Sequence, residues 1–168
     1  MRIYLPSTPA ALCTAIRSGL PLCGEGSIGY GPTTFFREEV GVDDREELEY
    51  LAMIEAAQAA VRALAANEER SPCPPRRVVI AADVADDDLV VTPEVHPAAV
   101  RTRVPILQDA VAAIHVDEAD TVPLVERAVR SLRDPQTPDD ELLDELADRP
   151  LLWYDRSELD TFCATVGP

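Results

Sequence analysis

Lysine is absent from this chain of 168 residues. All fifteen basic residues are arginine, against 31 aspartates and glutamates, so the formal net charge is -16. The missing lysine indicates the codon bias of a GC-rich genome, with a salt-adapted proteome as the alternative. Surplus carboxylates repel phosphate backbones, so direct nucleic-acid binding is disfavoured, while a basic protein partner or a cation is favoured. A surface that only keeps the protein soluble is the simpler interpretation.

Aromatic residues make up only 5% of the chain, and no stretch approaches the ~20 apolar residues of a membrane span. The opening residues 1–10 lack the long apolar segment of a secretion signal. The four cysteines form no C-x-x-C pair, which excludes the spacing of a zinc ribbon or a thioredoxin-like site. We therefore expect a cytoplasmic protein without membrane contact, whose Cys13 and Cys163 are reduced and pack as small hydrophobic residues.

Hydrophobic residues make up 46% of the chain, which is typical of folded proteins. A chain of this length buries about 70% of its unfolded surface, so a core can form without a metal. No internal repeat and no long linker interrupts the sequence. Residues 1–168 are therefore predicted to form a single globular domain.

The clearest local pattern is a helix over residues 44–66, because apolar residues recur there every three or four positions, and Asp43 or Asp44 is predicted to cap it. Further helices are predicted over 9–18, with Thr8 as its cap and Pro9 as its first residue, and over 121–133, with Thr121 as its cap. Two more are predicted after the capping residues Thr137 and Ser157. Short β-branched runs predict strands at 2–5, 76–84, 89–92, 98–104, 112–116 and 151–154. The fold class is therefore α/β (α+β): a mixed sheet covered by helices, of which a two-layer ferredoxin-like sandwich is one realisation.

Motifs of known chemistry are almost missing. Gly24–Gly29 matches the letters G-x-G-x-x-G, but it follows a predicted helix and runs into Gly31 and Pro32. A dinucleotide loop must follow a strand and open a helix, so we interpret this segment as a flexible loop and expect no cofactor. A brief strand around Ile28–Tyr30 is the alternative for its last residues. No nucleophile-elbow, zinc-protease or phosphate-loop motif is present, which leaves open whether the protein is an enzyme.

Acidic residues follow two predicted strands. Asp83 closes the strand at 76–84 and Asp86–Asp88 come after it, while Asp117, Glu118 and Asp120 follow the strand at 112–116. If the two strands are parallel neighbours, Asp83 and Asp117 meet at one edge of the sheet and could hold Mg²⁺ or Ca²⁺. His115 lies on the same strand face as Asp117 and is a candidate general base. Helix capping and strand termination are the simpler roles of these acids, and packing is the simpler role of His115 and His96.

The segment at residues 151–159 contains the only tryptophan, Trp153, followed by Tyr154. Both side chains combine an apolar body with a polar tip, which suits core edges and interfaces. Packing at the edge of the core is the simpler interpretation. If Trp153 is exposed, Trp153 and Tyr154 become the best candidates for binding a partner.

Five segments resemble an uncharacterised actinobacterial family of small acidic proteins. They are MRIYLPST at the start, REELEYLAMIEAAQAAVRALAA at 45–66, RRVVIAADV at 76–84, AVAAIHVDEAD at 110–120 and LLWYDRSEL at 151–159. Their order matches over most of the chain, and residues 19–36 are the least similar part. The resemblance implies a bacterial cytosolic protein of one domain, and it transfers no activity or site residue.

Two functions remain. The preferred hypothesis is a non-enzymatic binding or adaptor protein that uses its acidic surface to engage a basic protein partner. The alternative is a divalent-metal-dependent or small-ligand enzyme at the carboxylate-rich strand ends, with Asp83 and Asp117 as ligands and His115 as base.

Overall fold

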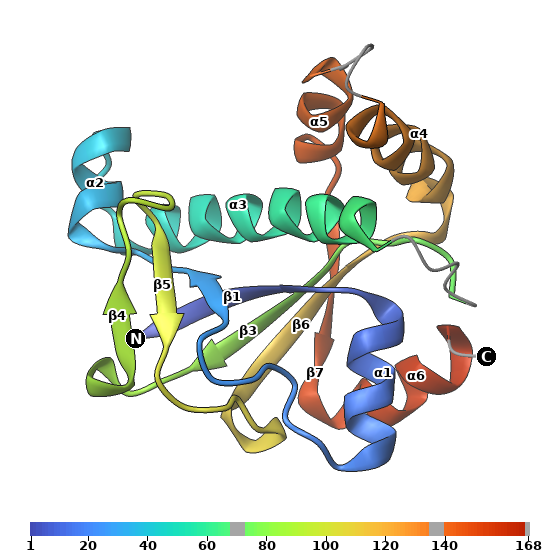
Figure 1. Cartoon of the computed structure of the whole chain (residues 1–168), viewed down its shortest axis with the longest axis horizontal. Coiled ribbons are helices and arrows are strands. Elements are labelled where there is room, and N and C mark those ends of the chain that lie inside the picture. Colours follow the sequence, from blue (N-terminus) through green and yellow to red (C-terminus); the bar gives the residue numbers. More distant parts are fainter. Residues whose placement is uncertain (68–72, 135–139, 167–168) are drawn as a thin grey trace.

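The computed structural model describes residues 1–67, 73–134 and 140–166. Its seven strands form one sheet in the order β4-β5-β2-β1-β3-β6-β7, and all neighbouring strands are antiparallel (Figure 1). The strands are β1 (Arg2–Ser7), β2 (Ile28–Tyr30), β3 (Val78–Asp83), β4 (Leu89–Val91), β5 (Ala99–Thr102), β6 (Val111–Asp117) and β7 (Leu151–Asp155). The helices are α1 (Pro9–Ser18), α2 (Thr34–Val40), α3 (Arg45–Ala66), α4 (Val122–Arg133), α5 (Asp140–Ala147) and α6 (Leu159–Val166).

This architecture confirms the α/β class and the helix-covered sheet, and it differs from the expectation in two details. The sheet is antiparallel throughout its described strands rather than mixed. Helices cover both of its faces, so the chain forms three layers instead of a two-layer ferredoxin-like sandwich. The reason is the alternation of buried side chains: β1 and β3 are apolar on both sides, and each side needs a helical cover.

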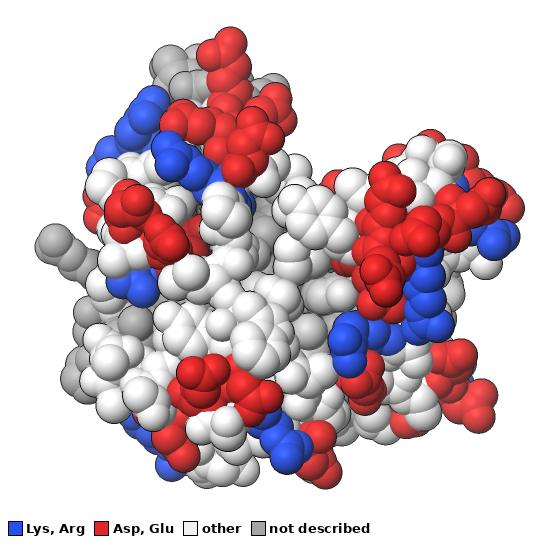
Figure 2. All heavy atoms as spheres, turned by 180° about the vertical axis from the view of Figure 1, so that it is seen from behind, with Lys and Arg blue, Asp and Glu red and all other residues white. Residues whose placement is uncertain are grey.

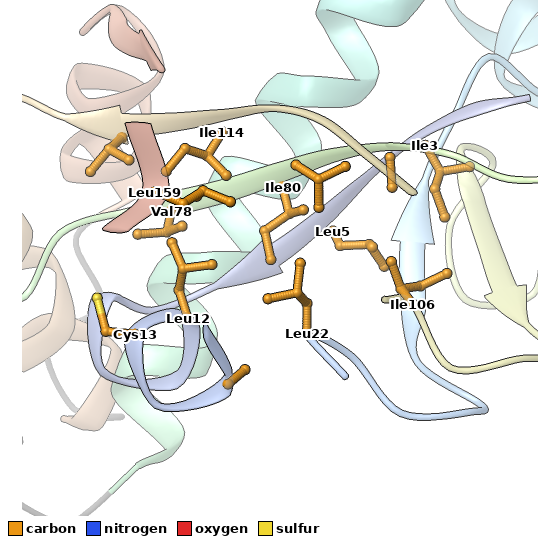
Figure 3. Packing of buried hydrophobic residues seen from close by; sticks show 14 of the residues in the cluster. Ile3, Leu5, Leu12, Cys13, Leu22, Val78, Ile80, Ile106, Ile114 and Leu159 are labelled. Carbon is orange, nitrogen blue, oxygen red and sulfur yellow. The ribbon is translucent and has the colours of Figure 1, made fainter. Parts of the chain in front are cut away.

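One face of the sheet packs against α1 and α6. Ile3 and Leu5 of β1 and Val78 and Ile80 of β3 point to this side and meet Leu12 of α1 (Figure 3). Thr8 caps α1 by accepting a hydrogen bond from the N–H of Ala11, and Pro9 takes the first helical position, as the sequence predicts.

Cys13 and Cys163 join α1 to α6 through a disulfide between residues 150 positions apart in sequence. The prediction that these two cysteines are reduced is therefore wrong. Each lies in an apolar helix face, and the neighbouring helices bring the sulfurs together. The other cysteines, Cys23 and Cys73, form no disulfide.

The opposite face of the sheet is covered by α3. Its buried stripe is made of small residues, Ala52, Ala56 and Ala57, which let the helix approach Tyr4 of β1 and Val79 of β3 closely. Asp44 caps the helix by accepting a hydrogen bond from the N–H of Glu47. Within the described residues, no helix is both long enough and apolar enough to span a membrane.

A third apolar cluster lies at the C-terminal end of α3, where Val61 packs with Val125 of α4 and Leu146 of α5. Arg133 of α4 donates hydrogen bonds to the last carbonyls of α3, at Leu64 and Ala65. In Figure 1, α4 and α5 stand beyond one end of α3 and α2 stands at the other. The predicted cap at Thr137 lies outside the described residues.

Candidate functional site

The two carboxylates expected to share a metal lie at opposite ends of neighbouring strands. Val78 pairs with Val116, so Asp117 lies beside the beginning of β3, whereas Asp83 is the last residue of β3. A strand of six residues is about 17 Å long. The expected convergence required parallel strands, and β3 and β6 are antiparallel. Within the described residues, no group of three or more His, Cys, Asp or Glu side chains is arranged to hold a metal ion.

The carboxylate of Asp83 is paired with the guanidinium group of Arg2. Nε and Nη2 of Arg2 donate to its two carboxylate oxygens at 3.1 and 2.8 Å. The hydrogen bond from Arg2 lowers the pKa of the Asp83 carboxyl below its usual value. Both side chains are partly exposed, so this is a surface pair that contributes little to stability.

Asp117 is held by a buried cation. Its carboxylate is 0% exposed and accepts hydrogen bonds from Nη2 of Arg77 at 2.7 Å and from the Arg77 main-chain N–H at 2.7 Å. Arg77 also donates to the carbonyls of Leu146 and Arg149, at the end of α5. The pair therefore clamps β3 and β6 to the segment that leads into β7. A carboxylate satisfied in this way is a structural group.

Among the residues that the structure describes, none is an acid that orients His115. It shares a strand face with Asp117, as predicted, but the Asp117 carboxylate belongs to Arg77. Burial lowers the pKa of His115, and the charge of Arg2 adds to this effect. The centroid of its ring lies 6.4 Å from that of the Tyr4 ring. Among the described residues, its imidazole has no hydrogen-bond partner of the kind that a general base uses.

The other histidine sits in a pairing that the sequence pattern did not predict. Nε2 of His96 lies 3.5 Å from Oε2 of Glu55 on α3, and its Nδ1 accepts a hydrogen bond from the N–H of Ala98. The rings of Tyr30 and Phe36 pack against the imidazole. Glu55 is 41 positions away in sequence, so no local spacing could reveal the pair. The arrangement fixes the loop before β5 to α3.

The end of the glycine-rich stretch forms a strand of the sheet, β2, and the glycines before it lie in a loop. Gly29 lies in β2 and pairs with Val100 of β5. A Cβ at Gly29 would come within 3.0 Å of the Leu5 side chain and 3.3 Å of the Tyr4 carbonyl, so glycine is needed there for strand packing. A shallow pocket of about 330 Å³ lies nearby, lined by Thr33, Arg37 and Arg45 among others. Arg37 and Arg45 already face carboxylates of Asp43 and Glu49.

The aromatic pair on β7 is divided between surface and core. Trp153 is 58% exposed, so the simpler expectation, packing in the core or at its edge, does not describe this side chain. It pairs with His115 and lies on the face that α3 covers elsewhere. Tyr154 points to the other face, and its ring packs against Phe162 of α6 at 5.3 Å. Tyr154 therefore anchors β7, and Trp153 is the side chain that a partner can reach.

Trp153 is open because the helices cover other strands. The buried residues of α3 pack on β1, β2 and β3, and α4 and α5 pack on the far end of α3. β7 is the last strand of the sheet and carries a second exposed apolar side chain, Leu152, on its opposite face. An edge strand with exposed apolar residues on both faces is unusual, because proteins protect such edges from pairing.

The chain around β7 is acidic. Between residues 141 and 160 there are seven aspartates and glutamates and two arginines. Hydrogen bonds from Ser157 lower the pKa of Asp155, so this carboxylate at the end of β7 is ionised at neutral pH. In Figure 2, which views the molecule from behind, uncharged atoms fill the middle of the face and acidic groups surround them on several sides. Trp153 on β7, with Leu152 and these acids, is the candidate binding site.

Three comparisons set this site in context. The model of one protein family, a family of unknown function, matches residues 1–163. No curated protein matches the chain. No solved structure matches it. The match includes β7 and its flanking acids, and it assigns no role to any residue.

Proposed function

The chain belongs to the family of unknown function DUF6912, and we propose that it is a non-enzymatic binding protein that engages a basic protein partner at β7. The observation that carries this proposal is the exposed Trp153 on an edge strand within an acidic stretch. Tryptophan is enriched among the few interface residues whose truncation to alanine weakens binding by about 2 kcal/mol or more. The surrounding carboxylates select a partner of positive charge and speed its approach.

Self-association explains the exposed tryptophan less well. Two copies meeting at β7 would bring the same seven carboxylates of residues 141–160 against each other, on chains of net charge -16. Like charges across an interface oppose association, most strongly at low salt. A partner rich in arginine or lysine meets no such repulsion, because its positive charges are attracted to these carboxylates.

The alternative function, a divalent-metal-dependent or small-ligand enzyme at the strand ends, has no observation in its favour. Asp83 is paired with Arg2, and Asp117 is paired with Arg77 at the other end of β3. A protein that binds a metal in its folded state gains stability as the metal concentration rises. We expect the melting temperature to stay unchanged on adding Mg²⁺, Mn²⁺ or Ca²⁺, and a clear rise with one of them would support the enzyme.

An actinobacterial source and a cytoplasmic location are part of the same proposal. The order of the five sequence blocks and the use of arginine for every basic residue support the source. The disulfide between Cys13 and Cys163 is the observation that opposes the location, because disulfides are rare in reducing compartments. The acidic surface also supports the absence of direct nucleic-acid binding.

The decisive experiment compares three forms of the protein as bait in extracts of the source organism at low salt. The forms are the wild type, Trp153→Ala and a matched control, Phe35→Ala, whose ring on α2 is 52% exposed. We expect the wild type and Phe35→Ala to retain the same net-positive protein, and Trp153→Ala to lose it. Raising the salt concentration should release the partner from both binding forms.

A set of retained proteins that Trp153→Ala leaves unchanged would refute this proposal. So would the absence of any net-positive protein at low salt. Circular dichroism of each variant confirms that a loss of binding does not come from unfolding.

A further inference from the structure

The main chain of β7 has a free side that the neighbouring strand does not use. In an antiparallel pair, the N–H and C=O of a residue point to the same side, and the side alternates along the strand. The N–H of Asp117 donates to the carbonyl of Arg77 at 3.2 Å, on the β3 side of β6. By alternation, the main-chain groups of His115 also point toward β3. Because His115 pairs with Trp153, the N–H and C=O of Trp153 point away from β6.

An independent hydrogen bond at the end of β7 agrees with this alternation. The N–H of Asp155, two residues after Trp153, donates to Oε2 of Glu158 at 2.9 Å. That N–H therefore points away from β6 too. Leu151, two residues before Trp153, falls on the same side. Within residues 1–67, 73–134 and 140–166, no group accepts from the outward N–H of Trp153 or donates to its outward carbonyl.

We propose that the basic partner docks as an extended strand on this free side of β7 and becomes the eighth strand of the sheet. This inference rests on the proposed function and adds the mode of binding. Strand addition supplies main-chain hydrogen bonds at Leu151 and Trp153, and side chains of the added strand supply specificity. Glu158 occupies the N–H of Asp155, so the free ladder is short, and the Trp153 ring and the charges must contribute much of the affinity.

The geometry assigns a sequence pattern to the partner. Side chains of the added strand alternate between the two faces of the sheet. On one face they meet Trp153 and the ionised Asp155, which suit an arginine stacked on the indole and facing the carboxylate. On the other face they meet Leu152, which suits an apolar residue. The partner segment therefore alternates arginine with an apolar residue.

The direction of the added strand follows from the rest of the sheet, in which all described neighbours are antiparallel. The residue opposite Trp153 then exchanges both main-chain hydrogen bonds with it, and its side chain shares the face of Trp153. That residue is an arginine in the pattern above. The N–H groups of the arginines therefore point at β7, and those of the apolar residues point to solvent.

A defined peptide tests this mode on the wild-type protein. The probe has nine residues of alternating arginine and valine, and a glutamate–valine peptide of equal length is the charge control. Trp153 is the only tryptophan of the chain, so its fluorescence reports binding directly. Two further probes carry N-methyl groups on two arginines or on two valines. We expect methylated arginines to weaken binding at least about tenfold, because the hydrogen bonds to β7 are lost, and methylated valines to leave the Kd almost unchanged.

The outcomes separate the two proposals. Strand addition is wrong if the unmethylated peptide binds and the two methylated peptides bind with equal affinity. If Trp153→Ala still loses its partner in that case, the binding function is retained. No binding of the arginine–valine peptide, or equally strong binding of the glutamate–valine peptide, would overturn strand addition as well. The proposed binding function itself is wrong if Trp153→Ala retains every protein that the wild type retains.

Discussion

The two edge strands of the sheet, β4 and β7, leave different amounts of main chain open. In β4, the carbonyl of Asp88 accepts from Arg103 and the N–H of Thr92 donates to Ala99, so Leu89 and Val91 lie on the outward side by alternation. The N–H of Leu89 is already used by the carbonyl of Asp86. Counting only partners in the described parts of the chain, β4 therefore offers one outward residue, Val91, with both main-chain groups free, whereas β7 offers Leu151 and Trp153.

Whether an edge strand can stay exposed depends on how firmly its two ends are held. β4 has three residues and is protected in the usual way, by being short and by following the acidic run Asp86–Asp88. β7 has five residues and is secured at both ends. Arg77 binds the carbonyls before it, and the disulfide of Cys163 fixes the helix after it. A strand secured in this way can present an open edge without losing its register.

The largest effect is expected where the support of β7 begins. Arg77→Met leaves Asp117 as an unpaired buried charge and should lower the free energy of unfolding by about 3–5 kcal/mol. Arg2→Ala, which breaks the exposed pair with Asp83, is the matched control and should cost at most about 1 kcal/mol. Urea denaturation measures both. Similar losses of stability in the two variants would show that the buried Arg77–Asp117 pair has no special role. The double variant Arg77→Met with Asp117→Leu should recover part of the stability that Arg77→Met loses.

The support at the other end of β7 is the disulfide. Cys13→Ala with Cys163→Ala should lower the free energy of unfolding by about 2–5 kcal/mol, because the bond closes a long loop and restricts the unfolded chain. Hydrogen exchange of the amides should then rise more in β7 than in β4. Cys23→Ala is the control, since Cys23 forms no disulfide. Equal rises in both edge strands would show that the bond stabilises the chain without favouring β7.

A smaller effect separates binding from folding. Trp153→Ala should weaken binding of the arginine–valine peptide by about 2 kcal/mol and change the free energy of unfolding by less than about 0.5 kcal/mol, because the side chain is mostly exposed. Val91→Ala on β4 should change neither quantity. Calorimetric titration gives the Kd without a tryptophan signal. If the two variants weaken binding equally, the peptide does not distinguish the two edges.

The smallest effect concerns the imidazole that lies opposite Trp153. Burial and Arg2 lower the pKa of His115 below its ordinary value of 6.5. As the pH falls below that value, the unfolded chain takes up a proton before the folded one does, so the free energy of unfolding decreases. His115→Gln should flatten this decrease, as measured by urea denaturation between pH 7 and pH 5. His96→Gln, at the Glu55 contact, is the control, and an unchanged slope in His115→Gln would contradict the effect.

Local elements followed from local sequence. Thr8 and Asp44 cap their helices as the pattern predicts, because a cap depends on residues within one turn. Two other caps differ: Thr121 makes no capping hydrogen bond, and Asp155 rather than Ser157 caps the last helical segment, in a capping box with Glu158. In both places several polar residues within a few positions could take the capping position. The tertiary structure decides which of them does.

The sequence predicted only part of the candidate site. Trp153 could be named because it is the only tryptophan, but its neighbour Tyr154 belongs to the core against Phe162. Asp83 and Asp117 looked equivalent as acids after strands, yet one is paired at the surface and the other is buried with Arg77. The antiparallel direction of β3 and β6 places the two carboxylates at opposite ends of β3. Which strands become neighbours depends on contacts between residues far apart in sequence.

The amino-acid sequence by itself determined the excess of negative charge, the positions of most helices and strands, and the presence of one tryptophan in an acidic stretch. These are properties of composition and of contacts within a few residues. Only the tertiary structure decided that the strands are antiparallel, that Cys13 meets Cys163, and that β7 is an edge strand whose outward groups at Trp153 have no partner within the described residues. Those features depend on packing between segments up to 150 positions apart, which no local pattern encodes.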